Sequence, residues 1–259
     1  ENFKHKELFY STFLSPLFFD ALNNPNRKDD VFTLTDSKIP YLSGGLFDED
    51  NLKTKEIIIP EKHFEDIFEF LDKYNFTIDE NSDIDDKNEF SVDPEMLGHI
   101  FENLLEDNKD KGAFYTPKVI VQYMCQESLI EYLNTQINVS ENTEVKSAIE
   151  ELIRTRLFDK CSTLELVEPI SKALYNVKIC DPAIGSGAFP MGTLNVIYQT
   201  IEELWFNQPD SVASIWNISD TEWQPHLVKK NIIQNSIYGV DIENGAVDIA
   251  RLRFWLSLI

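Results

Sequence analysis

The stretch that decides the fold is Val177-Lys178-Ile179-Cys180-Asp181-Pro182-Ala183-Ile184-Gly185-Ser186-Gly187-Ala188-Phe189. Its first four residues predict a short strand that runs directly into a glycine loop. After the loop, apolar residues at helical spacing predict a helix, namely Leu194, Ile197, Ile201 and Leu204. A second strand is predicted over 237–240, ending in Asp241, and a further helix from about residue 244. This order is typical of the first half of a doubly wound α/β nucleotide-type fold.

The glycine loop and the two acids indicate the kind of ligand. Gly185 and Gly187 have no Cβ, so the backbone can adopt positive φ and approach a ligand closely. A dinucleotide fingerprint needs a third glycine where Pro190 stands, and the Gly-Lys-Ser/Thr of a phosphate loop is absent. Asp181 would repel a phosphate but would attract a cation. S-adenosylmethionine, which carries a sulfonium and an ammonium, therefore fits best, with Asp241 placed for its ribose hydroxyls; the alternative is that the two glycines only form a tight turn.

Helix-start signals dominate the chain before the glycine loop. Pro60, the run Asp93-Pro94-Glu95 and the pair Thr116-Pro117 each predict the start of a helix, and residues 142–158 read as one more amphipathic helix. We therefore expect the chain to be mostly helical up to about residue 175.

Composition and charge exclude several classes of protein. The chain has 259 residues, 42% of them hydrophobic, and its 45 acidic and 23 basic residues leave a net charge of -22. The apolar content excludes an acidic disordered chain, and the acidity argues against a nucleic-acid coat protein. Residues 1–110 hold 27 acidic and 11 basic residues, so most of the negative charge lies there. The acidic run 79–86 lacks the glycine and the distal Glu of a calcium loop, so no metal site is expected.

Three cysteines, Cys125, Cys161 and Cys180, match neither a disulfide framework nor a zinc site. We expect a reduced cytoplasmic chain with ordinary buried thiols. No apolar run is long enough to span a bilayer, so no membrane is expected as a partner.

Three motifs resemble those of DNA adenine-N6 methyltransferases. Residues 181–189 resemble motif I, residues 112–117 (Gly-Ala-Phe-Tyr-Thr-Pro) resemble motif X, and residues 238–242 (Tyr-Gly-Val-Asp-Ile) are similar to motif II. They occur in the order of one subgroup of these enzymes. Residues 40–47 and 97–102 are similar to conserved features of large fused restriction–modification enzymes, the type IIG kind, and of related phage-defence methylases.

The resemblance implies a fold, an activity and a set of site residues. The expected architecture is an acidic, mainly helical region over 1–110, followed over 111–259 by the first half of a Rossmann-like, S-adenosylmethionine-dependent methyltransferase domain. The intact enzyme would transfer a methyl group from S-adenosylmethionine to adenine N6 in duplex DNA. Tyr115 and Thr116 would lie near the methionine end of the cofactor, with the Thr116 hydroxyl also capping a helix. The implied cofactor-binding residues are Phe114, Tyr115, Thr116, Asp181, Pro182, Ala183, Gly185, Gly187, Phe189, Asp241 and Ile242.

The sequence departs from this family in two ways. Gly187 and Asp241 are 54 residues apart, which predicts an insertion around 208–225, a candidate interaction surface. The catalytic Asn/Asp-Pro-Pro-Tyr/Phe motif, which binds a flipped adenine in the family, does not occur. The chain begins at Glu1 and ends 18 residues after Asp241, so we expect a piece of a longer enzyme, without catalytic residues and inactive alone.

Two further expectations follow. The apolar end of the chain, Phe254, Trp255, Leu256, Leu258 and Ile259, predicts self-association through the last helix. The alternative to the enzyme hypothesis is a non-catalytic module of a phage-defence complex that senses S-adenosylmethionine or binds a protein partner.

Overall fold

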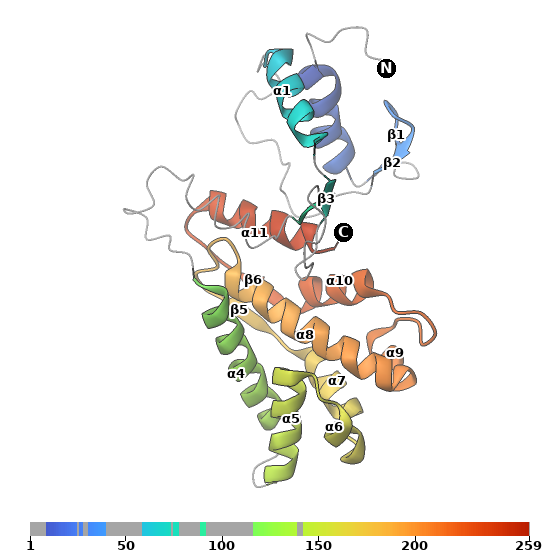
Figure 1. Ribbon diagram of the computed structural model, residues 1–259, viewed down its shortest axis with the longest axis vertical. Coiled ribbons are helices and arrows are strands. Elements are labelled where there is room, and N and C mark those ends of the chain that lie inside the picture. The colour runs from blue at the N-terminus through green and yellow to red at the C-terminus, as the bar shows by residue number, and fades with distance from the viewer. Residues whose placement is uncertain are drawn as a thin grey trace. The chain divides into compact units, whose positions relative to one another are not determined.

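The computed structural model describes residues 9–24, 26–27, 31–39, 59–73, 75–77, 89–91, 116–138 and 142–258 (Figure 1). The chain forms two compact units, Glu1–Asp93 and Pro94–Ile259. This division and the boundary predicted near residue 110 both fall within 92–115, outside the described residues, so the predicted boundary stays a prediction. The helix predicted from Asp93 and the acidic run 79–86 also lie outside them.

The first unit combines short helices with small strands. Two π-helical turns, η2 (Tyr10–Leu14) and η3 (Pro16–Leu22), precede an antiparallel pair, β1 (Val31–Phe32) and β2 (Ser37–Lys38). The helix predicted after Pro60 is confirmed as α1 (Glu61–Leu71). β3 (Asn75–Thr77) and β4 (Glu89–Ser91) form a parallel pair. The expectation of a mostly helical chain before residue 175 therefore missed these two small sheets.

Aromatic contacts hold the described part of the first unit together. The Phe9 ring packs edge-on against Phe64 and Phe68 of α1, with ring centroids 5.1 and 5.6 Å apart. Phe13 in turn packs edge-on against Phe32 of β1. Such edge-to-face contacts link the N-terminal turns to both α1 and the first strand pair.

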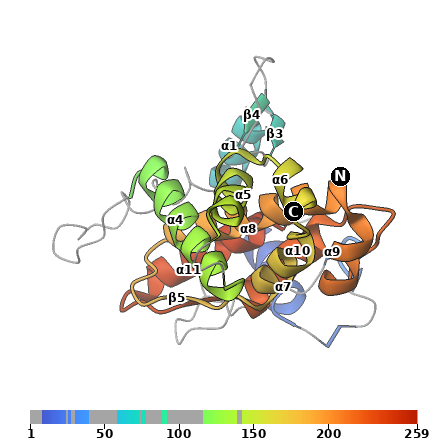
Figure 2. The same ribbon diagram turned by 90° about the horizontal axis from the view of Figure 1, so that it is seen from below.

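The described part of the second unit is a helical body with one parallel strand pair (Figures 1 and 2). Its elements, in chain order, are α4 (Lys118–Gln136), α5 (Thr143–Thr155), α6 (Asp159–Thr163), α7 (Val167–Asn176), β5 (Ile179–Asp181), α8 (Ala188–Asn207), α9 (Pro209–Trp216), α10 (Pro225–Asn235), β6 (Ile237–Gly239) and α11 (Asn244–Leu256). The helices predicted after Thr116-Pro117, within 142–158, after the glycine loop and from about residue 244 are confirmed. The two predicted strands are confirmed, with β5 starting two residues later than expected. The described chain is thus helix-rich with few strands, compatible with the α/β class.

α8 lies at the centre of this unit and packs against α4, α9 and α10. Its predicted apolar stripe is buried completely, with 0% exposure at Leu194, Ile197, Ile201 and Leu204. α4 and α8 run side by side in both views, and α5 packs along α4 (Figures 1 and 2). Asn142 caps α5 by accepting hydrogen bonds from the amides of Glu144 and Val145. The core of the unit therefore lies between α8 and the helices that pack against it, α4, α9 and α10.

Part of the segment 208–225, which was expected to be an insertion and a candidate interaction surface, contributes to the core. α9 packs against α7 and α8 and buries Val212, Ala213 and Trp216. The Trp216 Nε1 donates to the buried Ser171 Oγ of α7 over 3.1 Å. The long spacing between Gly187 and Asp241 thus contains three helices, α8, α9 and α10, followed by β6.

β5 and β6 pair in parallel and have two unlike faces. Cys180 is the register partner of Tyr238, and Ile179 that of Ile237. Ile179 and Ile237 pack against the helical core, whereas Cys180 is exposed and Tyr238 is 50% exposed. Because side chains alternate along a strand, one face of the pair is covered by helices and the other is open.

One expectation about side-chain burial is corrected, and the expected self-association is not supported. Cys125 and Cys161 are buried as expected, but Cys180 is exposed because it lies on the open face of β5. Phe254, Trp255, Leu256 and Leu258 are partly buried, and Phe254 packs against the core, so the structure does not support self-association through these side chains. Among the residues that the structure describes, none of the helices is long and apolar enough to cross a bilayer.

Candidate functional site

The parallel pairing places the two predicted acids at one edge of the strand pair. Asp181 is the last residue of β5 and is the register partner of Gly239, the last residue of β6. Asp241 follows two residues later, and both carboxylates are partly buried. The carboxyl ends of parallel strands are where ligands bind in open α/β sheets. The structure therefore brings the acids of motif I and motif II to the same edge.

Backbone hydrogen bonds continue the pairing beyond the strands. The Val240 amide donates to the Asp181 carbonyl, and the Ile184 amide donates to the Val240 carbonyl, both over 3.0 Å. Ile184 also lies against Gly239, where an added Cβ would come within 2.2 Å of the Ile184 Cδ1. The loop after β5 is thus folded directly onto the end of β6.

Asp241 binds the glycine loop itself. Its Oδ2 accepts from the Gly185 amide over 2.8 Å, and its Oδ1 accepts from the Glu243 amide over 2.9 Å. The sequence assigned this residue to a ribose, and nothing in the residue pattern predicted a bond to the loop. Each carboxylate oxygen has a second lone pair, so these bonds leave capacity for further donors.

Asp181 shapes the first part of the loop. Its Oδ1 accepts from the Ala183 amide over 3.0 Å, a turn in which the side chain bonds the backbone two residues later. Pro182 and Ala183 are exposed in consequence. The carboxylate is therefore oriented by the loop that it precedes.

The two loop glycines are required for different reasons. Both have positive φ, 52° at Gly185 and 87° at Gly187. A Cβ at Gly185 would meet no atom within 4 Å, whereas one at Gly187 would lie 3.1 Å from the Ala250 Cβ of α11. Gly185 thus borders open space that a ligand can enter, while Gly187 permits the close packing of α11. The role of both glycines in lining the cofactor stays a prediction; of the two, only Gly185 has open space where a Cβ would stand.

A residue that the sequence interpretation missed supports the loop from α11. Arg253 is only 4% exposed, and its Nη1 donates to the Ser186 carbonyl over 2.8 Å and contacts the Ser186 Oγ at 3.4 Å. Ala246, Ala250 and Arg253 form the buried side of α11 at spacings of four and three residues. The sequence signal that could have identified Arg253 is a basic residue at helical spacing from the apolar residues Ala246 and Ala250.

The helix that follows motif X packs directly on the helix that follows motif I. At Gly192 of α8 an added Cβ would lie 2.5 Å from the Val121 Cγ1 of α4, so the two helices approach closely. The Thr193 Oγ1 donates to the Cys125 Sγ over 3.2 Å and to the Phe189 carbonyl over 2.9 Å. The start of α4 is therefore fixed relative to the first turn of α8.

The remaining predicted residues have mixed outcomes. Phe114 and Tyr115 lie outside the described residues, and Thr116 is partly buried just before α4. The N-cap residue of α4 is Pro117, whose side chain has no acceptor, and no side-chain hydrogen bond caps the helix, so the capping role predicted for Thr116 is wrong. Phe189 packs against the core, and Ile242 is 97% exposed beside Asp241.

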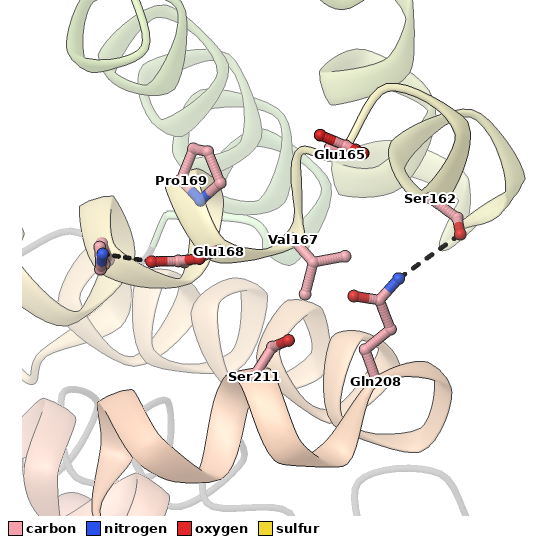
Figure 3. Close-up of a pocket in the computed structure, with 8 residues that line it drawn as sticks. Ser162, Glu165, Val167, Glu168, Pro169, Gln208 and Ser211 are labelled. Atoms are coloured by element: carbon pink, nitrogen blue, oxygen red, sulfur yellow. Dashed lines mark hydrogen bonds and ion pairs between the residues drawn. The ribbon is translucent and has the colours of Figure 1, made fainter.

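A separate hollow lies at the other side of the helical body. It has a volume of about 670 Å³ and is lined by Ser162, Glu165, Val167, Glu168, Pro169, Lys172, Gln208 and Ser211 (Figure 3). Gln208 donates to the Ser162 Oγ over 3.5 Å, and Lys172 pairs with Glu168 on α7. None of its lining residues belongs to the predicted site. Among the described residues, no group of three or more His, Cys, Asp or Glu is placed to hold a metal ion.

Comparison with known proteins gives two relatives. A protein of Methanocaldococcus jannaschii named as a type II restriction enzyme and methyltransferase is 29% identical over 97% of this chain, and the adenine-specific methyltransferase BrxX of Escherichia coli O9:H4 is 24% identical over 91%. The chain spans only 21% and 16% of the length of these relatives. No family model matches, and no solved structure matches. The resemblance predicted from the motifs is thereby confirmed: the chain is similar to a type II restriction enzyme and methyltransferase and to an adenine-specific methyltransferase.

Proposed function

We propose that the second unit is the methyl-donor-binding part of a site-specific DNA adenine-N6 methyltransferase, with the first half of a Rossmann-like domain as its frame. The observation that carries the proposal is the arrangement at the strand ends. There the loop 182–187 lies between the carboxylates of Asp181 and Asp241, beside open space at Gly185.

The residues at this edge fit S-adenosylmethionine. When bound, that cofactor supplies an activated methyl group on a sulfonium. Its two positive groups favour a site with two carboxylates, and its ribose hydroxyls can donate to the free lone pairs of Asp241. Asp181 would hold the amino-acid end of the cofactor, and Ile242 offers an exposed apolar surface next to Asp241, the residue assigned to the ribose. The residues described here thus bind and orient the donor.

We propose that this chain does not transfer the methyl group alone. Its 259 residues contain no Asn/Asp-Pro-Pro-Tyr/Phe sequence, the segment that contacts the target adenine in the resembling family. Binding of S-adenosylmethionine by this chain is expected to be weak, and duplex DNA is a partner of the longer enzyme.

Calorimetric titration with S-adenosylmethionine tests the site. Asp181→Ala should weaken binding roughly tenfold or more, because a hydrogen-bonding charge is lost. The control is Asp210→Ala, which removes an exposed acid of α9 beside the hollow of Figure 3. Equal affinities of the wild type and Asp181→Ala would overturn the assignment of the loop.

Transfer of tritiated methyl to duplex DNA tests the enzyme hypothesis. We expect no incorporation by this chain and clear incorporation by a longer polypeptide that carries Asn-Pro-Pro-Tyr or a close variant. A longer polypeptide that binds S-adenosylmethionine but lacks this motif and transfers nothing would instead support a cofactor-sensing module.

A further inference from the structure

The inference concerns Arg253, a cation buried beneath the glycine loop. Its guanidinium donates to the backbone carbonyl of Ser186, the central residue of the Gly-Ser-Gly sequence, which is itself only 4% exposed. The two residues are 67 positions apart in the chain. The contact therefore links the helix after motif II to the loop of motif I.

This contact fixes one particular peptide group. The Ser186 carbonyl belongs to the same peptide plane as the Gly187 amide, which donates to the Ile184 carbonyl over 2.8 Å. That plane is thus held at both its oxygen and its nitrogen, at a residue whose φ is 87°. Glycine readily populates other backbone conformations, so a loop with two glycines needs such restraints to keep one shape.

Core packing alone does not explain an arginine at this position. Burying a guanidinium carries a desolvation penalty, and an apolar residue of similar size often stabilises a core as well or better. The neighbours on the buried side of α11 are the small residues Ala246 and Ala250. Ala250 lies against Gly187, so the helix approaches the loop closely enough for the arginine to reach it.

Asp241 holds the preceding part of the same loop. Its carboxylate accepts from the Gly185 amide, and Arg253 donates to the carbonyl one residue later. A negative and a positive side chain from the same downstream segment therefore restrain successive parts of the loop. Binding sites gain affinity when the groups that contact the ligand are held in place before the ligand arrives.

We propose that Arg253 is a positioning residue for the donor-binding loop: it holds the Ser186–Gly187 peptide so that the loop is pre-formed for S-adenosylmethionine, without touching the cofactor. This inference rests on the proposed function for the nature of the ligand. The restraint on the loop itself does not depend on that ligand.

The experiment compares three variants of the whole chain. Arg253→Met keeps the approximate volume and removes the donors, and Arg253→Lys restores a positive donor. Arg251→Met is the matched control, since Arg251 lies on the same helix, is exposed and pairs with Asp248. Each is measured by hydrogen exchange of a peptide covering residues 182–189, by thermal unfolding, and by calorimetric titration with S-adenosylmethionine.

We expect Arg253→Met to speed exchange of the loop peptide while leaving exchange of residues 194–204 in α8 unchanged. Its affinity for S-adenosylmethionine should fall roughly tenfold, as for one lost charge-assisted hydrogen bond, with partial recovery in Arg253→Lys. Arg251→Met should behave as the wild type in all three measurements.

The outcomes separate the two proposals. Unchanged loop exchange in Arg253→Met would overturn the positioning role, whether or not the cofactor binds. Faster hydrogen exchange of the loop in Arg253→Met, together with no binding of S-adenosylmethionine by the wild type, would support the restraint on the loop. It would at the same time contradict the proposed function. If Arg253→Met does not fold, Ser186→Ala decides: it removes the hydroxyl that Arg253 contacts at 3.4 Å but leaves the carbonyl, so we expect near-normal loop exchange because the carbonyl contact remains. Loop exchange as fast as in an unfolded peptide in that variant would contradict a restraint acting through the carbonyl.

Discussion

In the helical layer formed by α4, α5, α7 and α8, side chains such as Leu133, Ile149 and Leu194 are completely buried. In the strand-tip region, which comprises residues 181–187 and 239–243 with the Arg253 side chain, the contacts are mainly hydrogen bonds between charged side chains and loop backbone. The layer depends on the removal of apolar surface from water, and the strand-tip region depends on fixed polar geometry. Substitutions in the layer should therefore change stability, whereas those in the strand-tip region should mainly change binding.

The largest effect is expected in the helical layer. Leu194→Ala should lower the free energy of unfolding by about 2–5 kcal/mol, because it leaves a cavity beneath α8. Urea unfolding measures the change. Leu157→Ala is the control, since Leu157 is 55% exposed and should change stability by less than about 0.5 kcal/mol. Similar losses in both variants would contradict the described core.

The two loop glycines should differ in what their substitution changes, stability at Gly187 and binding at Gly185. Gly187→Ala should lower the free energy of unfolding by about 1–3 kcal/mol, because the new Cβ would meet Ala250 and because φ is positive. Gly185→Ala should lower the free energy of unfolding by about 1 kcal/mol, from backbone strain alone, since the space beside Gly185 is open. It should nevertheless reduce the affinity for S-adenosylmethionine. Thermal unfolding and titration of both variants check this order. A larger stability loss at Gly185 than at Gly187 would show that the two roles are reversed.

Alkaline pH should weaken the packing of α6 against the helical layer, because Cys161 of α6 is buried there. Burial raises the pKa of its thiol from 9.0 to about 11, so the folded state retains the proton when the unfolded state has lost it. The corresponding stability is present below pH 9 and declines as the pH rises from about 9 to about 11. Urea midpoints across this range should fall less steeply in Cys161→Ala than in the wild type. Cys180→Ala, at an exposed position, should follow the wild type, and identical slopes in all three proteins would refute the assignment.

The smallest perturbation probes the open face of the strand pair. Of the three cysteines, only Cys180 should react quickly with a thiol reagent under native conditions, and Cys125 and Cys161 should react after unfolding. Mass spectrometry of the labelled peptides identifies the site. Fast labelling of Cys125 would mean that the α4–α8 contact opens readily.

Local signals predicted the helices α1, α4, α5, α8 and α11 and the strands β5 and β6, but not the contacts between them. Pro60 and Thr116-Pro117 located the starts of α1 and α4, since proline fixes φ where a helix begins. The bond from Gly185 to Asp241 spans 56 residues, and that from Arg253 to Ser186 spans 67, so no local pattern could reveal them. The exposure of Cys180 likewise depends on which helices cover β5, which a strand's own residues do not determine. The inward role of α9 was missed because the segment 208–225 was predicted from the spacing between Gly187 and Asp241 alone, without regard to its apolar residues Val212, Ala213 and Trp216.

The central claim is that the methyl donor binds at the strand-tip region and not in the hollow of Figure 3. Hydrogen exchange of the whole chain, with and without saturating S-adenosylmethionine, tests it most directly. The account predicts slower exchange in peptides covering 181–189 and 239–243, with no change in peptides covering 162–172 and 208–211. Protection confined to the latter two peptides would contradict it.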